Sequence, residues 1–431
     1  MFTKTTLPDG LRLITVPMDG VSTVTILVMV NTGSNNETRE VNGSSHFLEH
    51  MFFKGTKRRP HAKIVAEEID RLGAYSNAFT SHEHTGYHIK VRAEKFPEAL
   101  DLIADVYSNS LVDPAEVEKE RGAIIQEYRM IHDTPQRLIG YLFEELLYGD
   151  QPAGWEIAGT PERIQGLTAD DLKSYFLRQY SRENTFVVLA GNLAAAGGGA
   201  AGAVARAFGN VRSSQPHMRP PVMEEQSRPQ IKIQIKETDQ THLILGVRAF
   251  GATEEQHRFT ASVLAHLLGG SMASRLFEEI REKRGLAYAV ATSFDEYTTY
   301  GSLATYAGVA HENVAKSISL ILVEYQKIRD AAVPEAELAR AKESLKGRLA
   351  ISLEASDDLA FFVGGEEVMT GKPMTTEEVF ARIDAVSAEE VQAVARRVFR
   401  PEGLNLAMIG PIRDQEPLSR LLADFRSPHQ P

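Results

Sequence analysis

The sequence resembles itself, and this internal similarity constrains the fold more strongly than any other feature. Glu-Glu-Ile at residues 67–69 and Gly-Ala-Tyr at 73–75 are echoed by Glu-Glu-Ile at 278–280 and Gly-Leu-Ala-Tyr at 285–288. Solenoids need about three or more stacked repeats, and only two copies are visible here. The similarity therefore predicts two domains of similar fold that arose by duplication.

A segment rich in proline, serine and charge divides the chain almost evenly. Residues 213–230 contain Pro216, Pro220, Pro221 and Pro229 and are typical of an interdomain linker. We expect one domain at residues 1–212 and another at residues 231–431. Strands are expected at 11–17, 23–31 and 243–250, and long helices at 113–131 and 335–353. The predicted fold class is α+β, with two similar α/β domains that each pack helices on a mostly antiparallel sheet.

The composition excludes several classes of protein and of site. The 431 residues include no cysteine, which excludes disulfides, thiolate metal sites and cysteine catalysis. A net charge of −11 argues against nucleic-acid binding, which needs a basic surface. The apolar run at 24–30 is too short to span a bilayer and is expected to be a buried strand. Because residues 1–10 contain no apolar signal segment, we expect a cytoplasmic protein without membrane attachment.

The sequence Ser-Ser-His-Phe-Leu-Glu-His-Met at residues 44–51 carries the strongest chemical signal. In an α-helix, positions i, i+3 and i+4 share a face, so His46, Glu49 and His50 would lie together. Two imidazoles four residues apart can bind one zinc ion, and the carboxylate beside them can act on a water molecule. The order His-x-x-Glu-His reverses the zincin pattern. The alternative is a helix with two surface histidines and a solvated glutamate.

A catalytic zinc site also needs a third protein ligand. The helix expected after Asp113 offers carboxylates, and Glu120 and Glu127 share one face because they are seven residues apart. One of them can bind metal while the other orients a ligand. Apolar residues flank Glu127, where a carboxylate is costly to bury without a partner, so a ligand role is open to it. For Glu116 and Glu118, a solvated helix face is the simpler interpretation.

The second half lacks these groups when the two halves are aligned. Setting His50 against His266, and Glu116 against Glu337, leaves the second copy without metal ligands. His266 is therefore expected to be structural. The other aligned pairs are His46 with Ser262, Glu49 with Ala265, and Glu127 with Arg348.

Together these motifs resemble the pitrilysin-like, M16-type zinc peptidases, in the group that contains the beta subunit of mitochondrial processing peptidase and short bacterial relatives. The family pattern is His-x-x-Glu-His, then 76 residues, then a glutamate; residues 51–126, which number 76, separate His50 from Glu127. The resemblance implies that His46, His50 and Glu127 bind one zinc ion per chain. It also implies Glu49 as the general base and Glu120 as a supporting carboxylate. The resemblance extends over essentially the whole chain, and the stretches that match best are residues 43–56, 77–91, 118–130 and 274–288.

The resemblance also implies substrate contacts. One segment looks like the family's edge strand beside the metal. That strand pairs with the substrate backbone, so it recognises an extended conformation rather than particular side chains. Arg281 and Tyr288 match the spacing of the arginine and tyrosine that the family's inactive half supplies. Tyr288 would donate a hydrogen bond to the tetrahedral oxyanion and Arg281 would hold the substrate; the alternatives are a core aromatic and a solvated charge. The residues of the edge strand are Asn77, Ala78, Phe79 and Thr80.

By the same resemblance, residues 1–212 form the catalytic domain and residues 231–431 an inactive copy. Two chains are expected to close like a clam around a chamber. A homodimer is expected because this chain carries both the His-x-x-Glu-His motif and the arginine and tyrosine pair. The implied function is a zinc-dependent endopeptidase for short or unfolded peptides. The alternatives are a catalytic subunit that needs a different partner chain and a non-catalytic structural homologue. The sequence does not specify the natural substrate, the cleavage preference or the metal used in vivo.

Two further patterns carry expectations. His82, His84 and His88 alternate with period two, so we expect them on one strand face in structural or substrate-groove roles. Residues 192–204 are nearly all alanine and glycine and lack the Lys-Ser/Thr ending of a phosphate loop. They are expected to form a loop that leads into a weak surface helix.

Overall fold

The computed structural model describes residues 2–197 and 199–425, which form two compact units. Unit 1 contains the residues up to Arg129, together with Trp155–Pro221 and Ile351–Thr375. Unit 2 contains Met130–Gly154, Val222–Ala350 and the described residues from Thr376 onward. Each unit has a sheet of its own. Among the described helices, none combines the length and apolar character that a membrane crossing requires.

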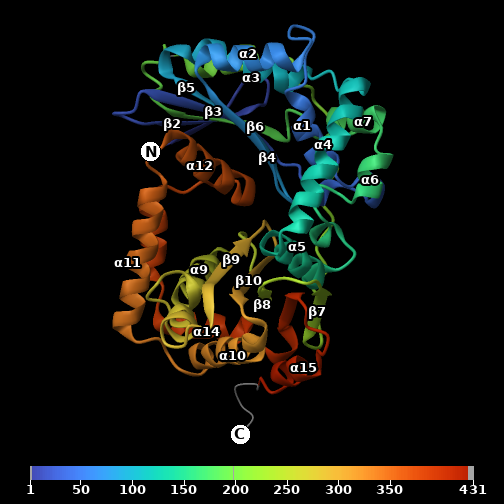
Figure 1. Ribbon diagram of the computed structural model, residues 1–431. Helices are drawn as coiled ribbons and strands as arrows, with labels where there is room; N and C mark the ends of the chain where they lie inside the picture. The colour runs from blue at the N-terminus through green and yellow to red at the C-terminus, as the bar shows by residue number, and fades with distance from the viewer. Residues whose placement is uncertain (1, 198, 426–431) are drawn as a thin grey trace. The chain divides into compact units, whose positions relative to one another are not determined.

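The sheet of unit 1 has six strands in the order β1-β2-β6-β3-β5-β4 (Figure 1). The pair β2 and β6 is parallel and the other pairs are antiparallel, so the sheet is mostly antiparallel, as predicted. The strands are β1 (Thr3–Thr6), β2 (Arg12–Pro17), β3 (Thr23–Val30), β4 (Tyr75–Thr80), β5 (Thr85–Arg92) and β6 (Thr185–Gly191).

The central strand β3 explains why its sequence is apolar without interruption. Ile26 and Val28 belong to the large core on one face of the sheet, whereas Leu27 and Met29 belong to a smaller core on the other face. Successive side chains of a strand point to opposite faces, so a strand covered on both sides is apolar at every position. The expectation of a buried strand at residues 24–30 is confirmed.

Helices cover both faces of this sheet. Figure 1 shows α2 and α3 on one face and α12 on the other. The long helix predicted at 113–131 is α4, and the predicted surface helix after the alanine- and glycine-rich loop is α8. The helices of unit 1 are α1 (Ser44–Phe52), α2 (Ala62–Leu72), α3 (Phe96–Asn109), most of α4 (Pro114–Asp133), α6 (Pro161–Gly166), α7 (Ala169–Gln179), α8 (Ala200–Ala207) and α12 (Ser356–Thr370).

The sheet of unit 2 has five strands in the order β7-β11-β8-β10-β9. Again one pair, β7 and β11, is parallel and the others are antiparallel. The strands are β7 (Gln230–Ile235), β8 (Thr241–Ala249), β9 (Ala287–Glu296), β10 (Gly301–Val309) and β11 (Asn405–Gly410). The helices are α5 (Pro135–Tyr148), α9 (Glu255–Gly269), α10 (Val314–Asp330), α11 (Glu335–Ser352), α13 (Thr376–Ala385), α14 (Ala388–Val398) and α15 (Glu416–Ala423).

The two sheets share one topology, which confirms the predicted pair of similar domains. In chain order, β2, β3, β4, β5 and β6 correspond to β7, β8, β9, β10 and β11, with the same neighbours and the same directions. The helices between equivalent strands also correspond, so α1 matches α9 and α4 matches α11. A shared order of this kind is what duplication of one ancestral unit produces.

The units depart from the predicted division into residues 1–212 and 231–431. The helix α5 comes from the first half but packs on β8 and β11 of unit 2. Its equivalent α12 comes from the second half but packs on β3 and β6 of unit 1. Ion pairs hold α12 there, since Glu367 accepts from both Lys4 and Arg12. The two halves have thus exchanged one helix each, because each sheet needs an apolar helix on its second face.

One of the histidine expectations is wrong. His88 lies in β5, but His82 and His84 lie in the turn between β4 and β5. The turn places them outside the alternating pattern of a strand. His82 Nδ1 is bonded to Ser34 Oγ at 2.8 Å, which is a structural contact.

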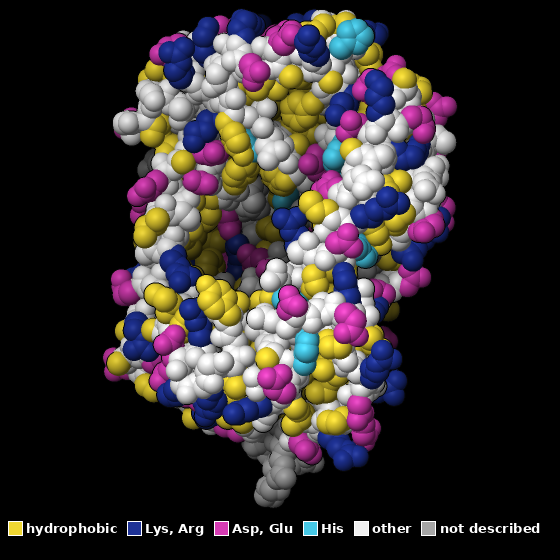
Figure 2. Space-filling model, viewed as in Figure 1, with side chains coloured by type: hydrophobic (Ala, Val, Ile, Leu, Met, Phe, Trp, Pro, Cys, Tyr) yellow, Lys and Arg dark blue, Asp and Glu magenta, His cyan; other side chains and the backbone are white. Residues whose placement is uncertain are grey.

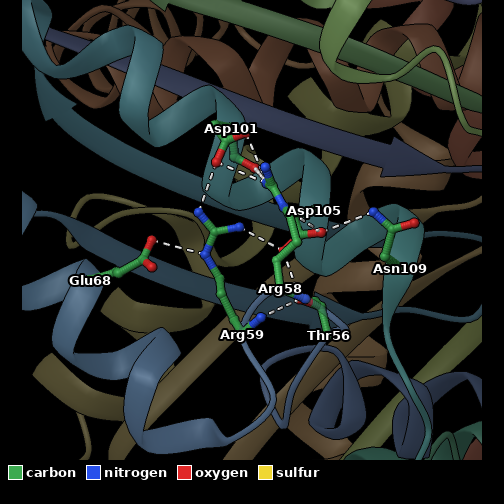
Figure 3. A network of polar contacts seen from close by, with 7 residues as sticks. All are labelled: Thr56, Arg58, Arg59, Glu68, Asp101, Asp105 and Asn109. Atoms are coloured by element: carbon green, nitrogen blue, oxygen red, sulfur yellow. Dashed lines mark hydrogen bonds and ion pairs between the residues drawn. The ribbon is translucent and has the colours of Figure 1, made fainter.

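A polar network fixes the segment that follows α1 (Figure 3). Arg59 reaches three carboxylates: Asp105 at 2.6 Å, Asp101 at 2.8 Å and Glu68 at 2.9 Å. Thr56 donates to Asp105 at 2.7 Å. Since Glu68 lies in α2 and both aspartates lie in α3, this network ties the exit of α1 to two other helices.

Charge on the surface is mixed. On the face shown in Figure 2, Lys and Arg side chains are interspersed with Asp and Glu. This visible part of the described surface has no broad basic stripe of the kind that nucleic-acid binding requires.

Candidate metal centre

The N-terminus of α1 is held by a carboxylate from outside the helix. The cap residue Gly43 has φ 98° and offers no side chain to the first N–H groups. A Cβ at this position would lie 2.6 Å from the carbonyl oxygen of Ala158, so only glycine fits. Glu37 caps the helix instead, accepting from the backbone N–H groups of Gly43 at 2.8 Å and Ser45 at 2.7 Å.

Burial raises the pKa of Glu37 to about 7, although the hydrogen bonds from Ser45 and Gly43 act against this shift. The contact lies at the positive end of the helix dipole, where a carboxylate is favoured.

The buried side of α1 fixes the direction of its polar side. Phe47, Leu48, Met51 and Phe52 are almost completely buried in the core of unit 1. This leaves the i, i+3, i+4 face of the same helix for His46, Glu49 and His50, as the sequence predicted.

The side chains of His46, His50 and Glu127 converge. Glu127 Oε2 lies 3.6 Å from His46 Nε2 and 3.4 Å from His50 Nε2. One ligand atom from each residue lies within 4.8 Å of the others. The imidazole centroids are 4.9 Å apart and the rings meet edge to face. The two helices α1 and α4 thus bring two imidazoles and one carboxylate to a single point.

Glu120 lies behind this point rather than in it. Its Oε2 is 3.2 Å from His50 Nδ1, the ring atom opposite the one that faces Glu127. Its Oε1 is 2.6 Å from Lys54 Nζ. A carboxylate on the far nitrogen of an imidazole fixes the ring orientation and the tautomer that leaves Nε2 free to bind metal.

The two histidines differ in their electrostatic surroundings. Burial lowers the pKa of His46 to about 4, and the neighbouring His50 adds to this effect. Burial acts in the same direction on His50, but hydrogen bonds with Glu127 and Glu120 outweigh it and raise the pKa. His46 is therefore neutral, which is the form that binds metal.

Glu49 lies on the same face of α1, beside the convergence point. Burial raises the pKa of Glu49, and a hydrogen bond from Thr80 opposes the rise. That bond joins Thr80 Oγ1 to Glu49 Oε2 at 2.5 Å. The carboxyl group is thus held in place by strand β4.

These groups fit a divalent metal of the zinc type. Two imidazole nitrogens and one carboxylate are a donor set that catalytic zinc sites use, and they leave a fourth position open. His46 Nδ1 is buried and has no hydrogen-bond partner among the residues described, so its ring is positioned by packing. A cation bound at this point would accept lone pairs from all three groups, in place of the proton that His50 and Glu127 can share.

The predicted substrate strand is β4, and it is an edge strand of the sheet. Ala78 packs on the core and Thr80 reaches Glu49, while Asn77 is exposed. Phe79 points to the other face, where its ring lies 5.5 Å from that of Phe361 in α12. One side of the β4 backbone pairs with β5, and no described strand pairs with the other side, although the N–H of Ala78 donates to Oδ1 of Asn77 at 2.9 Å. The side chain of Phe79 is structural.

Arg281 and Tyr288 lie together in unit 2. Arg281 is in the π-helical turn Phe277–Glu282, and its guanidinium carbon is 5.0 Å from the centroid of the Tyr288 ring. Tyr288 lies in the edge strand β9 and is 78% exposed, which excludes the alternative of a core aromatic. The ring and hydroxyl of Tyr288 are therefore accessible to a ligand.

Sequence reasoning missed three contacts of the site. Glu37 is six residues before the cap glycine, and no local pattern marks a cap donated from that distance. Lys54, which neutralises Glu120, follows α1 by two residues and looks like an ordinary surface lysine. The bond from Thr80 to Glu49 crosses from strand to helix, and no local sequence pattern marks it. The one available signal was the glycine at the start of α1, which has no side chain to cap the helix and so requires an acceptor from elsewhere.

Comparison with known proteins assigns the family. Residues 13–161 match the sequence profile of the insulinase family, peptidase family M16, and residues 166–345 match that of the peptidase M16 inactive domain. The chain is 36% identical to an uncharacterized zinc protease of Mycobacterium tuberculosis over 95% of this chain and 93% of that protein. It is 34% identical to the uncharacterized zinc protease YmxG of Bacillus subtilis, over 95% and 98% respectively.

Solved structures share the fold. A protease from Helicobacter pylori aligns with a TM-score of 0.86 and 22% identity, over 95% of this chain and 99% of that one. A chain of complex III2 from Candida albicans aligns with a TM-score of 0.83 and 18% identity, over 98% and 99%. The motif, the duplicated fold and the relatives agree with the resemblance to pitrilysin-like zinc peptidases, and the chain belongs to peptidase family M16.

Proposed function

We propose that this protein is a zinc-dependent endopeptidase that hydrolyses short or unfolded peptides. In this proposal, His46, His50 and Glu127 hold one zinc ion per chain. The observation that carries the proposal is the meeting of these three ligand groups beside the carboxyl group of Glu49. A purely structural zinc site would be closed by a fourth protein ligand, whereas this donor set leaves a position for substrate.

Bound zinc supplies Lewis acidity, which polarises a peptide carbonyl and makes a water molecule more acidic. The residues of the chain prepare this chemistry. Glu120 holds His50 by its Nδ1 atom, and Lys54 holds Glu120, so the imidazole cannot rotate away. Burial keeps His46 uncharged.

Glu49 is the proposed general base. Its carboxylate accepts the proton of the attacking water and returns it to the leaving amine, so the residue ends the cycle as it began. The hydrogen bond from Thr80 to Oε2 leaves Oε1 available for the proton. Glutamine at this position would keep the shape but could not accept the proton.

The edge strand β4 and the pair Arg281 and Tyr288 are the proposed substrate contacts. An extended peptide can add to the free edge of β4 through backbone hydrogen bonds, which tolerate many sequences. The hydroxyl of Tyr288 is proposed to donate to the developing oxyanion, and Arg281 to a substrate carbonyl. What supports these roles is the exposure of Tyr288, its stacking on Arg281 and the spacing of the two residues.

The proposed assembly is a homodimer that closes around a chamber. Support comes from the presence of both the metal motif and the Arg281 and Tyr288 pair in one chain. A second candidate function is a non-catalytic structural subunit, because one solved structure of the same fold is a chain of complex III2. The intact set of ligands favours the peptidase.

The purified chain alone, incubated with a library of unstructured peptides, tests the proposal. Cleavage that a chelator abolishes and added zinc restores is the expected result, with a dimer seen by size measurement. Cleavage that appears only after a second protein is added would replace the homodimer by a heteromeric enzyme. Absence of both cleavage and bound zinc would favour the structural subunit.

A further inference from the structure

A cavity lies in unit 2, and none of the residues proposed for catalysis or zinc binding lines it. Its volume is about 290 Å³, and its walls are formed by the C-terminal end of α9, the loop after it and one face of α11. The α11 residues in the wall follow the i, i+3, i+4 pattern of one helix face from residue 337 to residue 348. They are Glu337, Arg340, Ala341, Ser344 and Arg348.

This cavity occupies the place that the metal centre occupies in unit 1. The equivalents of α1 and α4 are α9 and α11, and His266 in the wall is the counterpart of His50. The counterparts of the acidic groups have changed: Arg348 stands for Glu127, and Ala341 stands for Glu120. The duplicated site has therefore exchanged carboxylates for a guanidinium.

The charge in the walls is now positive. Arg340 and Arg348 supply two guanidinium groups, and one carboxylate, Glu337, also contributes. That carboxylate is already paired with Arg275 by two hydrogen bonds, at 2.7 and 2.9 Å. Because Arg275 already neutralises the carboxylate of Glu337, that carboxylate does not cancel the positive charge of Arg340 and Arg348.

His266 also belongs to these walls. The residue is 6% exposed, and its Nε2 atom is buried without a hydrogen-bond partner within the described ranges. Because that atom has almost no accessible surface, it does not itself touch a ligand in the cavity. Burial and then the charge of Arg348 lower the pKa of His266, so the ring lies close enough to Arg348 to report on an anion bound there.

We propose that this cavity, named here the anion pocket, binds a small oxyanion through Arg340 and Arg348, beside the ring of His266. Arginine N–H groups are donors that proteins use for carboxylate, sulfate and phosphate groups. Arg348 is positioned for this role because it donates to the carbonyl of Gly270 at the start of the loop. One N–H of the five in its guanidinium is used in that bond, and the others remain for a ligand. The duplication thus produced a cation site in one unit and an anion site in the other.

Sulfate is a suitable probe because it is fully charged near neutral pH. The zinc-loaded, full-length chain is labelled in its histidine rings and titrated with sulfate, while chloride keeps the ionic strength constant. The His266 ring signals, identified by their loss in His266→Gln, should shift in a saturable way. Arg340→Gln and Arg348→Gln should each weaken the affinity by about tenfold, the order expected for one charge-assisted hydrogen bond.

Lys342→Gln is the matched control. It removes one positive charge from α11 outside the cavity, and Lys342 donates instead to the carbonyl of Asp384. The control should bind sulfate like the wild type. Arg340 is exposed, so its replacement leaves the core intact even if His266→Gln folds poorly. Absence of a saturable shift, or equal affinity in Arg340→Gln and the wild type, would overturn the proposal.

A second arm distinguishes the source of the anion. Acetyl-trialanine with a free carboxylate and its C-terminal amide are added to Glu49→Gln, which cannot hydrolyse them. Displacement of sulfate by the free acid alone supports a peptide terminus as the ligand, and displacement by neither supports a free inorganic anion. Equal displacement by acid and amide would contradict recognition of charge. Because the readout is binding at His266, these outcomes do not depend on the proposed peptidase activity.

Discussion

Replacing Glu120 by glutamine tests how the metal centre is held together. The substitution keeps the size of the side chain but removes its charge. In the wild type, Glu120 accepts from His50 Nδ1 at 3.2 Å and from Lys54 at 2.6 Å, with only 14% of its side chain exposed. Both contacts weaken in the variant, while His46, His50 and Glu127 remain.

The size of the effect follows from these contacts. A carboxylate behind a ligating imidazole typically contributes 10–100-fold to metal affinity. The 3.2 Å distance is at the long end for a hydrogen bond, which places the loss nearer tenfold, or about 1.4 kcal/mol. Breaking the ion pair between Glu120 and Lys54 lowers the zinc affinity further, because the positive charge of Lys54 is then unpaired near the proposed zinc ligands.

Competition with a chromogenic chelator measures the zinc affinity of both proteins. Glu116→Gln is the matched control on the same helix, since the carboxylate of Glu116 pairs with the exposed Lys119. The control should bind zinc like the wild type, and Glu120→Gln should bind it about tenfold more weakly. Equal affinity in all three proteins would refute the idea that Glu120 orients His50.

Other substitutions test the rest of the account. Arg59→Met should lower the free energy of unfolding by about 3 kcal/mol in urea titrations, because the buried Asp105 loses its closest cation and the bonds from Arg59 to Asp101 and Glu68 are lost with it; a change below about 0.5 kcal/mol would contradict this. Burial raises the pKa of Asp105, but hydrogen bonds from Thr56 and Arg59 outweigh it and lower the pKa below 3.8, so this stabilisation is present above pH 3.8 and lost below it. If the wild type lost stability between pH 6 and 5 while Arg59→Met did not, the pKa of Asp105 would be raised rather than lowered, which would contradict this prediction. Glu37→Ala should cost at least about 2 kcal/mol, since two buried N–H groups at the start of α1 lose their acceptor; thermal denaturation without a lower midpoint would count against the cap. Tyr288→Phe should lower kcat about 100-fold with little change in KM, and an unchanged kcat would remove Tyr288 from the mechanism.

The sequence predicted which residues converge, although the signals differ in kind. Helical spacing places His46, Glu49 and His50 on one face, which is a local signal. Glu127 lies on a second helix, and the family spacing of 76 residues after His50 singled it out. The duplicated topology was also predictable, because both halves repeat the same order of strands and helices.

The exchange of α5 and α12 was not predictable from the sequence. Both helices are apolar enough to cover a sheet, and their sequences do not say which sheet each one covers. The cap from Glu37 and the bond from Thr80 to Glu49 depend on the path of the chain between elements. His82 and His84 were misplaced because a turn interrupts what reads as one alternating strand.

Metal analysis combined with peptide cleavage, applied to the wild type and to Glu49→Gln, tests the central claim most directly. The account predicts one zinc ion per chain in both proteins and chelator-sensitive cleavage in the wild type alone. Cleavage by Glu49→Gln at the wild-type rate, or loss of its zinc, would contradict the assignment of Glu49 as the general base beside a site formed by His46, His50 and Glu127.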